Sequence, residues 1–201
     1  FKILGLNNIY NLIYTLMFSL LMYPSVGVPF VDHHSTILVL SAFCLFIFGV
    51  KKKNEIFFFF IPSLLIISFL CKQTPTTYGV IAIALLGLIY LFYVNNIKNF
   101  LLSSIYGSFL SFFILIFFFY LAKIPISNFL NQYIYFAGSI GDYRLSNWKI
   151  DFFGIIHEFK FILIPFAYSI YLNIIYYKSK TKDDFIILLS INFFTALMIF
   201  H

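Results

Sequence analysis

Charged residues are scarce in this chain of 201 residues, of which only 10% are Asp, Glu, Lys or Arg. Soluble domains typically contain about 25% charged residues. Hydrophobic residues make up 62% of the chain, and the mean hydropathy is +0.99. A soluble fold of this length needs more polar side chains to cover its surface. The composition therefore excludes a soluble enzyme and a disordered chain, and it indicates an integral membrane protein.

Cysteine is also scarce, because Cys44 and Cys71 are the two in the chain and neither has a metal-ligating spacing. We expect both to be free, buried thiols, which excludes a disulfide scaffold. The sequence patterns of nucleotide-binding P-loops, serine hydrolases and zinc proteases are missing as well. We therefore expect no cofactor, and a divalent metal ion is possible but not indicated.

Seven apolar segments dominate the chain, and several are shorter than the roughly 20 residues of a full membrane span. Only helices and closed barrels satisfy their backbone groups in lipid, and these segments lack the alternation of barrel strands. We predict an all-α fold, a polytopic transmembrane helical bundle with about seven spans. No repeat or linker divides the chain, so residues 1–201 form a single membrane domain. The predicted spans are residues 9–22, 36–50, 56–71, 78–94, 100–121, 161–177 and 185–200.

The two ends of the sequence predict a longer protein. The chain begins at Phe1 rather than at a methionine, and it ends at His201 directly after an apolar segment. No signal-peptide pattern opens it. We expect the chain to be part of a longer polytopic membrane protein.

Lysine residues set the expected orientation. Lys51–Lys53, Lys98 and the three lysines of residues 178–182, together with Lys2, place eight basic residues on one side against five on the other. Loops rich in lysine are usually cytoplasmic, so the opposite face is predicted to lie outside, in the periplasm of a bacterium. The predicted location is the bacterial inner membrane. Because topology accounts for the net charge of +6, the implied partner is the lipid bilayer and not nucleic acid.

A long outer loop is predicted over about residues 122–160. Ser127 and Asn128 can cap a helix at its start. Two apolar stripes at helical spacing follow, and they predict short helices that lie in the membrane interface. The first stripe is Phe129, Leu130, Tyr133, Ile134 and Ala137, and the second is Phe152, Phe153, Ile156 and Phe159.

The run PFVDHHST, residues 29–36, places Asp32, His33 and His34 just before the second predicted span. A carboxylate beside two imidazoles suits a general base, a phosphate site or a metal site. Two adjacent histidines point in different directions on a helix, which makes a shared metal awkward. The alternative is structural, with Asp32 or Ser35 capping the helix and the imidazoles in the headgroup layer.

The run CKQTPTTY, residues 71–78, places Lys72, Gln73 and Thr74 at the outer end of the third predicted span. A lysine at this boundary can extend its amino group into the headgroup layer without any other role. It can instead bind the phosphate of a lipid-linked substrate, with the polar side chains that follow as support.

Arg144 is the single arginine of the chain, and it lies in the long outer loop two residues after Asp142. Its planar guanidinium suits phosphate or carboxylate recognition, although a local pair with Asp142 is an equally simple reading. Before the sixth predicted span, His157 and Glu158 are candidate acids or bases, and Asp151 lies close by. The alternative is that these residues form the solvated face of an interfacial helix.

A chain in which PFVDHHST opens one span and FLCKQTPTTY closes the next outward-going one resembles bacterial GT-C-type membrane glycosyltransferases. The resemblance covers residues 23–94, and it is nearest to the glycosyltransferase 39 and RgtA/B/C/D-like group. Members often have a Pro-x-x-Asp element before one span, here Pro29 to Asp32. They often have a Lys-Gln or Lys-x-Thr element after a later span, here Lys72 to Thr74.

The resemblance implies sugar transfer from a polyprenyl-phosphate donor to a glycan or lipid acceptor at the outer membrane face. Lys72, Arg144, His33 and His34 would bind the donor phosphate, and Gln73 and Thr74 would give polar support. Asp32 would be a catalytic base or a supporting residue. The family places its main carboxylate in the first outer loop, whereas this chain has no acidic residue before Asp32, so that base would lie upstream of Phe1.

Three other classes fit parts of the same pattern. A polysaccharide polymerase or ligase also uses a long outer loop, but it usually depends on several arginines. A transporter or flippase usually carries charged residues in its spans, and the centres of the predicted spans have none. A non-catalytic membrane subunit predicts that Asp32, Lys72 and Arg144 can each be replaced without loss of function.

Overall fold

The computed structural model describes residues 7–21, 31–93, 97–136, 138–139, 152–176 and 182–200. Helices account for nearly all of these residues, and no strand occurs among them, so the predicted all-α fold is confirmed for the described part. The helices are α1 (Asn8–Leu21), α2 (Val31–Lys52), α3 (Glu55–Cys71), α4 (Gln73–Tyr93), α5 (Ile97–Leu121), α6 (Ile126–Phe129), the π-helical segment η2 (Leu130–Tyr135), α8 (Phe152–Tyr176) and α9 (Lys182–Phe200).

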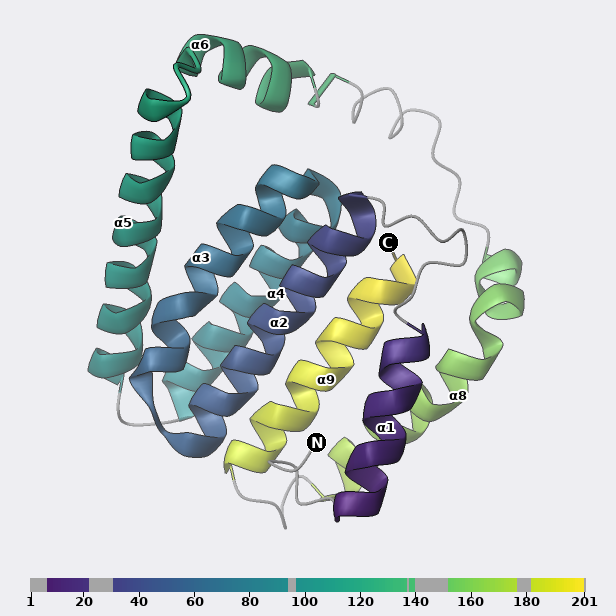
Figure 1. Ribbon diagram of the computed structural model, residues 1–201. Coiled ribbons are helices and arrows are strands. Elements are labelled where there is room, and N and C mark those ends of the chain that lie inside the picture. The colour runs from purple at the N-terminus through teal and green to yellow at the C-terminus, as the bar shows by residue number, and fades with distance from the viewer. Residues whose placement is uncertain are drawn as a thin grey trace.

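Four helices form the centre of the bundle. Figure 1 shows α2 between α3 and α9, with α4 behind them. Helix α5 packs on the outer side of α3, and α8 packs on α9 (Figure 1). The buried side chains in the centre are apolar, with Val39, Phe43, Phe46, Leu86 and Ile186 among the most deeply buried. Burial of such side chains stabilises each by about 1.5–3 kcal/mol, and it holds these helices together.

Local sequence explains where α3 and α4 begin. Asn54 caps α3, since its side-chain oxygen accepts a hydrogen bond of 3.0 Å from the backbone nitrogen of Ile56. Lys72 alone separates α3 from α4, and its backbone is extended. Pro75 is accommodated because it lies in the first turn of α4, where a backbone N–H would have no partner within the helix.

Small residues let α5 approach α3 closely. A Cβ atom at Gly107 would collide with the backbone carbonyl oxygen of Phe59. The hydroxyls of Ser63 and Ser111 lie 2.6 Å apart across the same interface. Small residues and serine hydroxyls commonly pack helices in this way within membranes.

The two ends of the bundle carry different residues. The Lys72 end holds the start of α2, the end of α3 and the start of α4. At the opposite end, which we call the Lys52 end, Lys53 Nζ lies 3.8 Å from Asp183 Oδ2. This ion pair places the end of α2 and the start of α9 at the same end, as the distribution of lysines predicted.

Three of the described helices are long and apolar enough to cross a membrane, by length and composition: His33–Lys52, Gln73–Phe92 and Phe100–Leu121. The apolar stretch of α3, Glu55–Cys71, and that of α8, Phe159–Ile175, are shorter. Every predicted span coincides with a helix over most of its length, but about seven spans are not confirmed. These helices indicate a membrane protein, and they do not show which end of the bundle faces the cytoplasm.

The long loop differs from its prediction in two respects. Ser127 and Asn128 do not cap a helix, because α6 already begins at Ile126 and its cap residue, Pro125, makes no side-chain hydrogen bond. The second apolar stripe is not a separate short helix, because α8 runs without a break from Phe152 to Tyr176. Pro165 does not interrupt α8, since membrane helices tolerate proline where neighbouring groups satisfy the backbone.

Candidate functional site

Three buried hydroxyl groups join α2, α3 and α4 at the Lys72 end. We call Ser35, Ser68 and Thr76 the hydroxyl cluster, and all three side chains are 0% exposed. The Ser35 hydroxyl lies 3.0 Å from that of Ser68 and 3.0 Å from that of Thr76. The cluster therefore fixes the first turns of α2 and α4 against the last turn of α3.

The hydroxyl cluster also binds the backbone at the break between α3 and α4. Ser35 and Thr76 each donate to the carbonyl oxygen of Lys72, over 3.1 and 2.8 Å, and Ser68 donates to the carbonyl oxygen of Ser35 over 3.0 Å. The three hydroxyls have only three protons to share among these bonds and their contacts with one another. The expectation that Ser35 caps α2 is wrong, because Ser35 lies one turn inside the helix and bonds to α3 and α4 instead.

The segment formed by α6 and η2 covers the junction of α3 and α4. Tyr133 of η2 donates its phenol proton to the carbonyl oxygens of Phe69, over 2.9 Å, and Leu70. Both belong to the last turn of α3, whose carbonyls have no partner within their helix. The Gln73 side chain donates in turn to the carbonyl oxygen of Tyr133. Burial, and less strongly the nearby Cys71, raises the pKa of the Tyr133 phenol, which keeps it a donor.

A pocket of about 330 Å³ lies between the first turns of α4 and η2. We call it the α4–η2 pocket. Its lining combines polar groups with an aromatic wall, and the residues are Phe69, Gln73, Thr74, Thr77, Tyr78, Tyr133, Ile134 and Gly138. The start of a helix presents free backbone N–H groups and the positive end of its dipole, which favours anions. This pocket can therefore accept an anionic group, and the half-buried Lys72 directly precedes its lining residue Gln73 in the chain.

The two motifs singled out in the sequence lie at the same end of the bundle. His33 and His34 belong to the first turn of α2, where His33 is half-buried and His34 exposed. Ser35, the residue after His34, donates a hydrogen bond to the carbonyl oxygen of Lys72 and so connects the two motifs. Of the proposed supporting residues, Gln73 is half-buried and Thr74 exposed, and both line the α4–η2 pocket. The backbone of Asp32 is part of α2, and its side chain lies outside the described structure.

The remaining candidates are not brought to this site by the described structure. Arg144 and Asp151 lie outside the described residues. His157 and Glu158 belong to α8, where His157 is exposed and the Glu158 side chain is not described. Among the described residues, no group of three or more His, Cys, Asp and Glu side chains could hold a metal ion. Cys44 and Cys71 are free thiols, as predicted, but the expected burial is wrong, since Cys44 is exposed and Cys71 is half-buried.

The sequence analysis missed the residues that build the site from within. Ser68 lies in an otherwise apolar segment, and a serine there gives little signal by itself. Tyr133 fits an apolar stripe as well as it fits a hydrogen-bonding role. One signal was present, because Ser68 lies one helical turn before Lys72 and Thr76 one turn after it.

Comparison with known proteins identifies no relative of this chain. No protein family, curated protein or solved structure matches the chain.

Proposed function

We propose that this chain is part of a membrane glycosyltransferase that moves a sugar from a polyprenyl-phosphate-linked donor to a glycan or lipid acceptor. The observation that carries the proposal is the junction of α2, α3 and α4. There Ser35, the residue after the two histidines of α2, donates to the carbonyl oxygen of Lys72. The two motifs that resemble GT-C-type glycosyltransferases thus meet at one helix junction, although 37 residues separate these two positions.

The proposal includes an orientation and a location. The seven apolar helical segments cross the bacterial inner membrane, with the Lys52 end in the cytoplasm. The Lys72 end then lies at the outer boundary, where the phosphate of a lipid-linked sugar also lies. The apolar tail of the donor lies among the helices. Because the phosphate is bound at the membrane boundary, no charged side chain has to enter the apolar interior of the membrane.

The reaction has two parts. As the bond from sugar to phosphate breaks, negative charge develops on the leaving phosphate, and the Lys72 ammonium and the first-turn amides of α4 stabilise it. Arg144 and a protonated His33 or His34 add positive charge on the same side. A carboxylate, for which Asp32 is the candidate in this chain, takes the proton from the acceptor hydroxyl. The segment of α6 and η2 covers the pocket and limits the access of water.

Sugar transfer by a lysine variant tests this proposal. Lys72→Ala should lower transfer from polyprenyl-phosphate hexose or pentose donors by about 100-fold or more, as loss of a group that stabilises developing charge commonly does. Lys160→Ala is the matched control, because Lys160 is exposed and far along the chain in α8. Transfer at the normal rate by Lys72→Ala, with both variants equally abundant in the membrane, would exclude the phosphate-binding role of Lys72.

A further inference from the structure

A second cavity lies between α8 and α9, and the proposed reaction does not use it. Its volume is about 530 Å³, within the range of about 300–1,000 Å³ that is typical of ligand sites. The lining consists of apolar and aromatic side chains with two amides, and it contains no charged residue. The lining residues are Phe166, Ile170, Asn173, Ile174, Phe185, Leu189, Asn192, Phe193 and Ala196.

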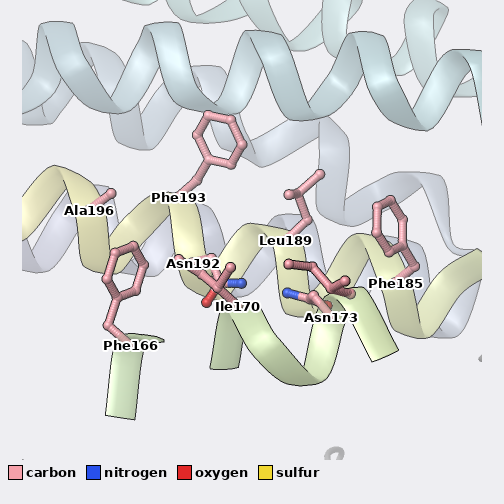
Figure 2. A pocket seen from close by; sticks show the side chains of 9 residues that line it. Phe166, Ile170, Asn173, Phe185, Leu189, Asn192, Phe193 and Ala196 are labelled. Atoms are coloured by element: carbon pink, nitrogen blue, oxygen red, sulfur yellow. The ribbon is translucent and has the colours of Figure 1, made fainter. Parts of the chain in front are cut away.

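The two asparagines in this cavity are buried without satisfied hydrogen bonds. Asn173 is 8% exposed and Asn192 is 9% exposed. In the described part of the chain, the nitrogen and oxygen of the Asn173 amide and the oxygen of the Asn192 amide have no hydrogen-bond partner. Figure 2 shows both amides, from facing helices, pointing into the space between α8 and α9. An unsatisfied buried amide is costly, so these groups call for a partner with both a donor and an acceptor.

The position of the amides in the bundle limits the nature of that partner. Asn173 lies three residues before the end of α8, and Asn192 lies ten residues after the start of α9. At 1.5 Å per residue, Asn173 lies about 5 Å from the end of α8, and Asn192 lies about 15 Å inside α9, near the middle of that helix. A charged head group would be costly at that depth, whereas a neutral one is tolerated. The site therefore lies on helices that do not line the α4–η2 pocket, and it suits an uncharged molecule.

We propose that the cavity between α8 and α9 binds an uncharged lipid alcohol, with its hydroxyl between Asn173 and Asn192 and its apolar chain against the aromatic wall. A hydroxyl fits the unsatisfied groups, because it donates to an amide oxygen and accepts from an amide nitrogen. The apolar lining buries the chain. This site does not depend on the proposed sugar transfer.

Photolabelling tests the site in the membrane-embedded chain. The probe is a photoreactive long-chain alcohol, and its control is the matched photoreactive hydrocarbon without the hydroxyl. We expect the alcohol to label peptides of α8 and α9, and unlabelled long-chain alcohol to compete. The hydrocarbon should label at least about fivefold less, as expected for the loss of one hydrogen bond. Equal labelling by both probes, or no labelling of α8 and α9, would overturn the proposal.

Variants of the two amides give a second test. Asn173→Leu and Asn192→Leu keep the branching and the number of heavy atoms of the side chain. Each should lower labelling by the alcohol by about fivefold while leaving labelling by the hydrocarbon unchanged. Thr195→Val is the matched control on α9, because the Thr195 hydroxyl already donates to the carbonyl oxygen of Ile191 over 2.9 Å. Unchanged labelling of both leucine variants by the alcohol would contradict the assignment. Competition by unlabelled long-chain alcohol in the wild-type chain tests the same site without any substitution.

Discussion

Ser35, Ser68 and Thr76 bury their hydroxyl groups completely where α2, α3 and α4 meet. Each hydroxyl bonds to the others and to the backbone, so removal of one leaves its partners buried with fewer bonds. A buried polar group that loses its partner costs about 1–3 kcal/mol. These small side chains thus determine how firmly Lys72 is positioned.

Ser68→Ala should lower the free energy of unfolding by about 1–3 kcal/mol, because the partners in the hydroxyl cluster lose a donor and an acceptor. Denaturation of the detergent-solubilised chain measures this change. Ser108→Ala is the control and should stay within about 0.5 kcal/mol, since Ser108 is exposed and bonds within its own helix. Equal stability of the two variants would show that the hydroxyl cluster contributes nothing to the junction.

Tyr133→Phe should release the segment of α6 and η2 from the end of α3, because it removes the bonds to Phe69 and Leu70. Cleavage by trypsin after the exposed Lys123 should become about fivefold faster, which corresponds to the loss of about 1 kcal/mol. Tyr120→Phe is the control, since Tyr120 is exposed. Equal cleavage rates in the two variants would contradict this role of Tyr133.

The same contact has a pH dependence with a defined sign. The pKa of the Tyr133 phenol is raised above its ordinary value of about 10. The neutral phenol makes the contact, so its contribution to stability is complete below that ordinary value and is lost as the pH rises through the raised pKa. Tyrosine-selective NMR titration, with the signal assigned by its loss in Tyr133→Phe, measures the shift.

At the scale of single residues, the sequence could reveal the candidates but not their partners. Lys72, Gln73 and Thr74 attract attention because polar groups interrupt an apolar sequence. The role of Ser68 depends on α2 packing beside it, and periodicity cannot show which helices are neighbours. Asn173 and Asn192 gave a signal that was overlooked, because amides in apolar helices are rare enough to need an explanation.

At the scale of helices, the boundaries of apolar segments were predictable and their connections were not. The end of α3 at Cys71 was predicted from the loss of hydropathy at Lys72. The start of α4 was misplaced, because Thr74, Pro75 and Thr76 are typical of a loop, whereas in the structure they form the first turn of the helix. Proline is compatible with that position, so composition could not separate a loop from a helix start.

Gly107→Ala should disrupt the packing of α5 on α3, because its methyl group would collide with the carbonyl oxygen of Phe59. We expect a loss of about 1–3 kcal/mol in the free energy of unfolding, as for other overpacked interfaces. Gly138→Ala is the matched control, since a Cβ there meets nothing within 4 Å. If Gly107→Ala proves as stable as Gly138→Ala, α5 does not approach α3 as closely as described.

At the scale of the whole molecule, the charge bias predicts that Lys51–Lys53 and the lysines of residues 178–182 lie on the same side of the membrane. The ion pair of Lys53 and Asp183 places the end of α2 and the start of α9 at one end of the bundle. The number of spans could not be settled from composition, since the apolar stretches Glu55–Cys71 of α3 and Phe159–Ile175 of α8 are shorter than a full span. Short helices cross a membrane when neighbouring helices and interfacial side chains compensate. The count of spans therefore depends on packing as well as on hydropathy.

Labelling of introduced cysteines tests the proposed orientation. In a chain with Cys44→Ala and Cys71→Ala, a membrane-impermeant thiol reagent should label Thr74→Cys in intact cells. It should label Lys52→Cys only after the membrane is permeabilised. Both positions are exposed, so accessibility alone does not distinguish them. The reverse pattern would place the Lys72 end in the cytoplasm and exclude sugar transfer at the outer face.

Binding of a polyprenyl phosphate to wild type and Lys72→Ala tests the central claim most directly, because it requires neither the sugar nor the acceptor. A charge-assisted bond to phosphate contributes about 1.5–3 kcal/mol, so wild type should bind about 10–100 times more tightly than the variant. Binding of the corresponding polyprenol, which lacks the phosphate, should be equal in the two proteins. Equal affinity of both proteins for the polyprenyl phosphate would contradict phosphate recognition by Lys72 and, with it, the proposed glycosyltransferase site.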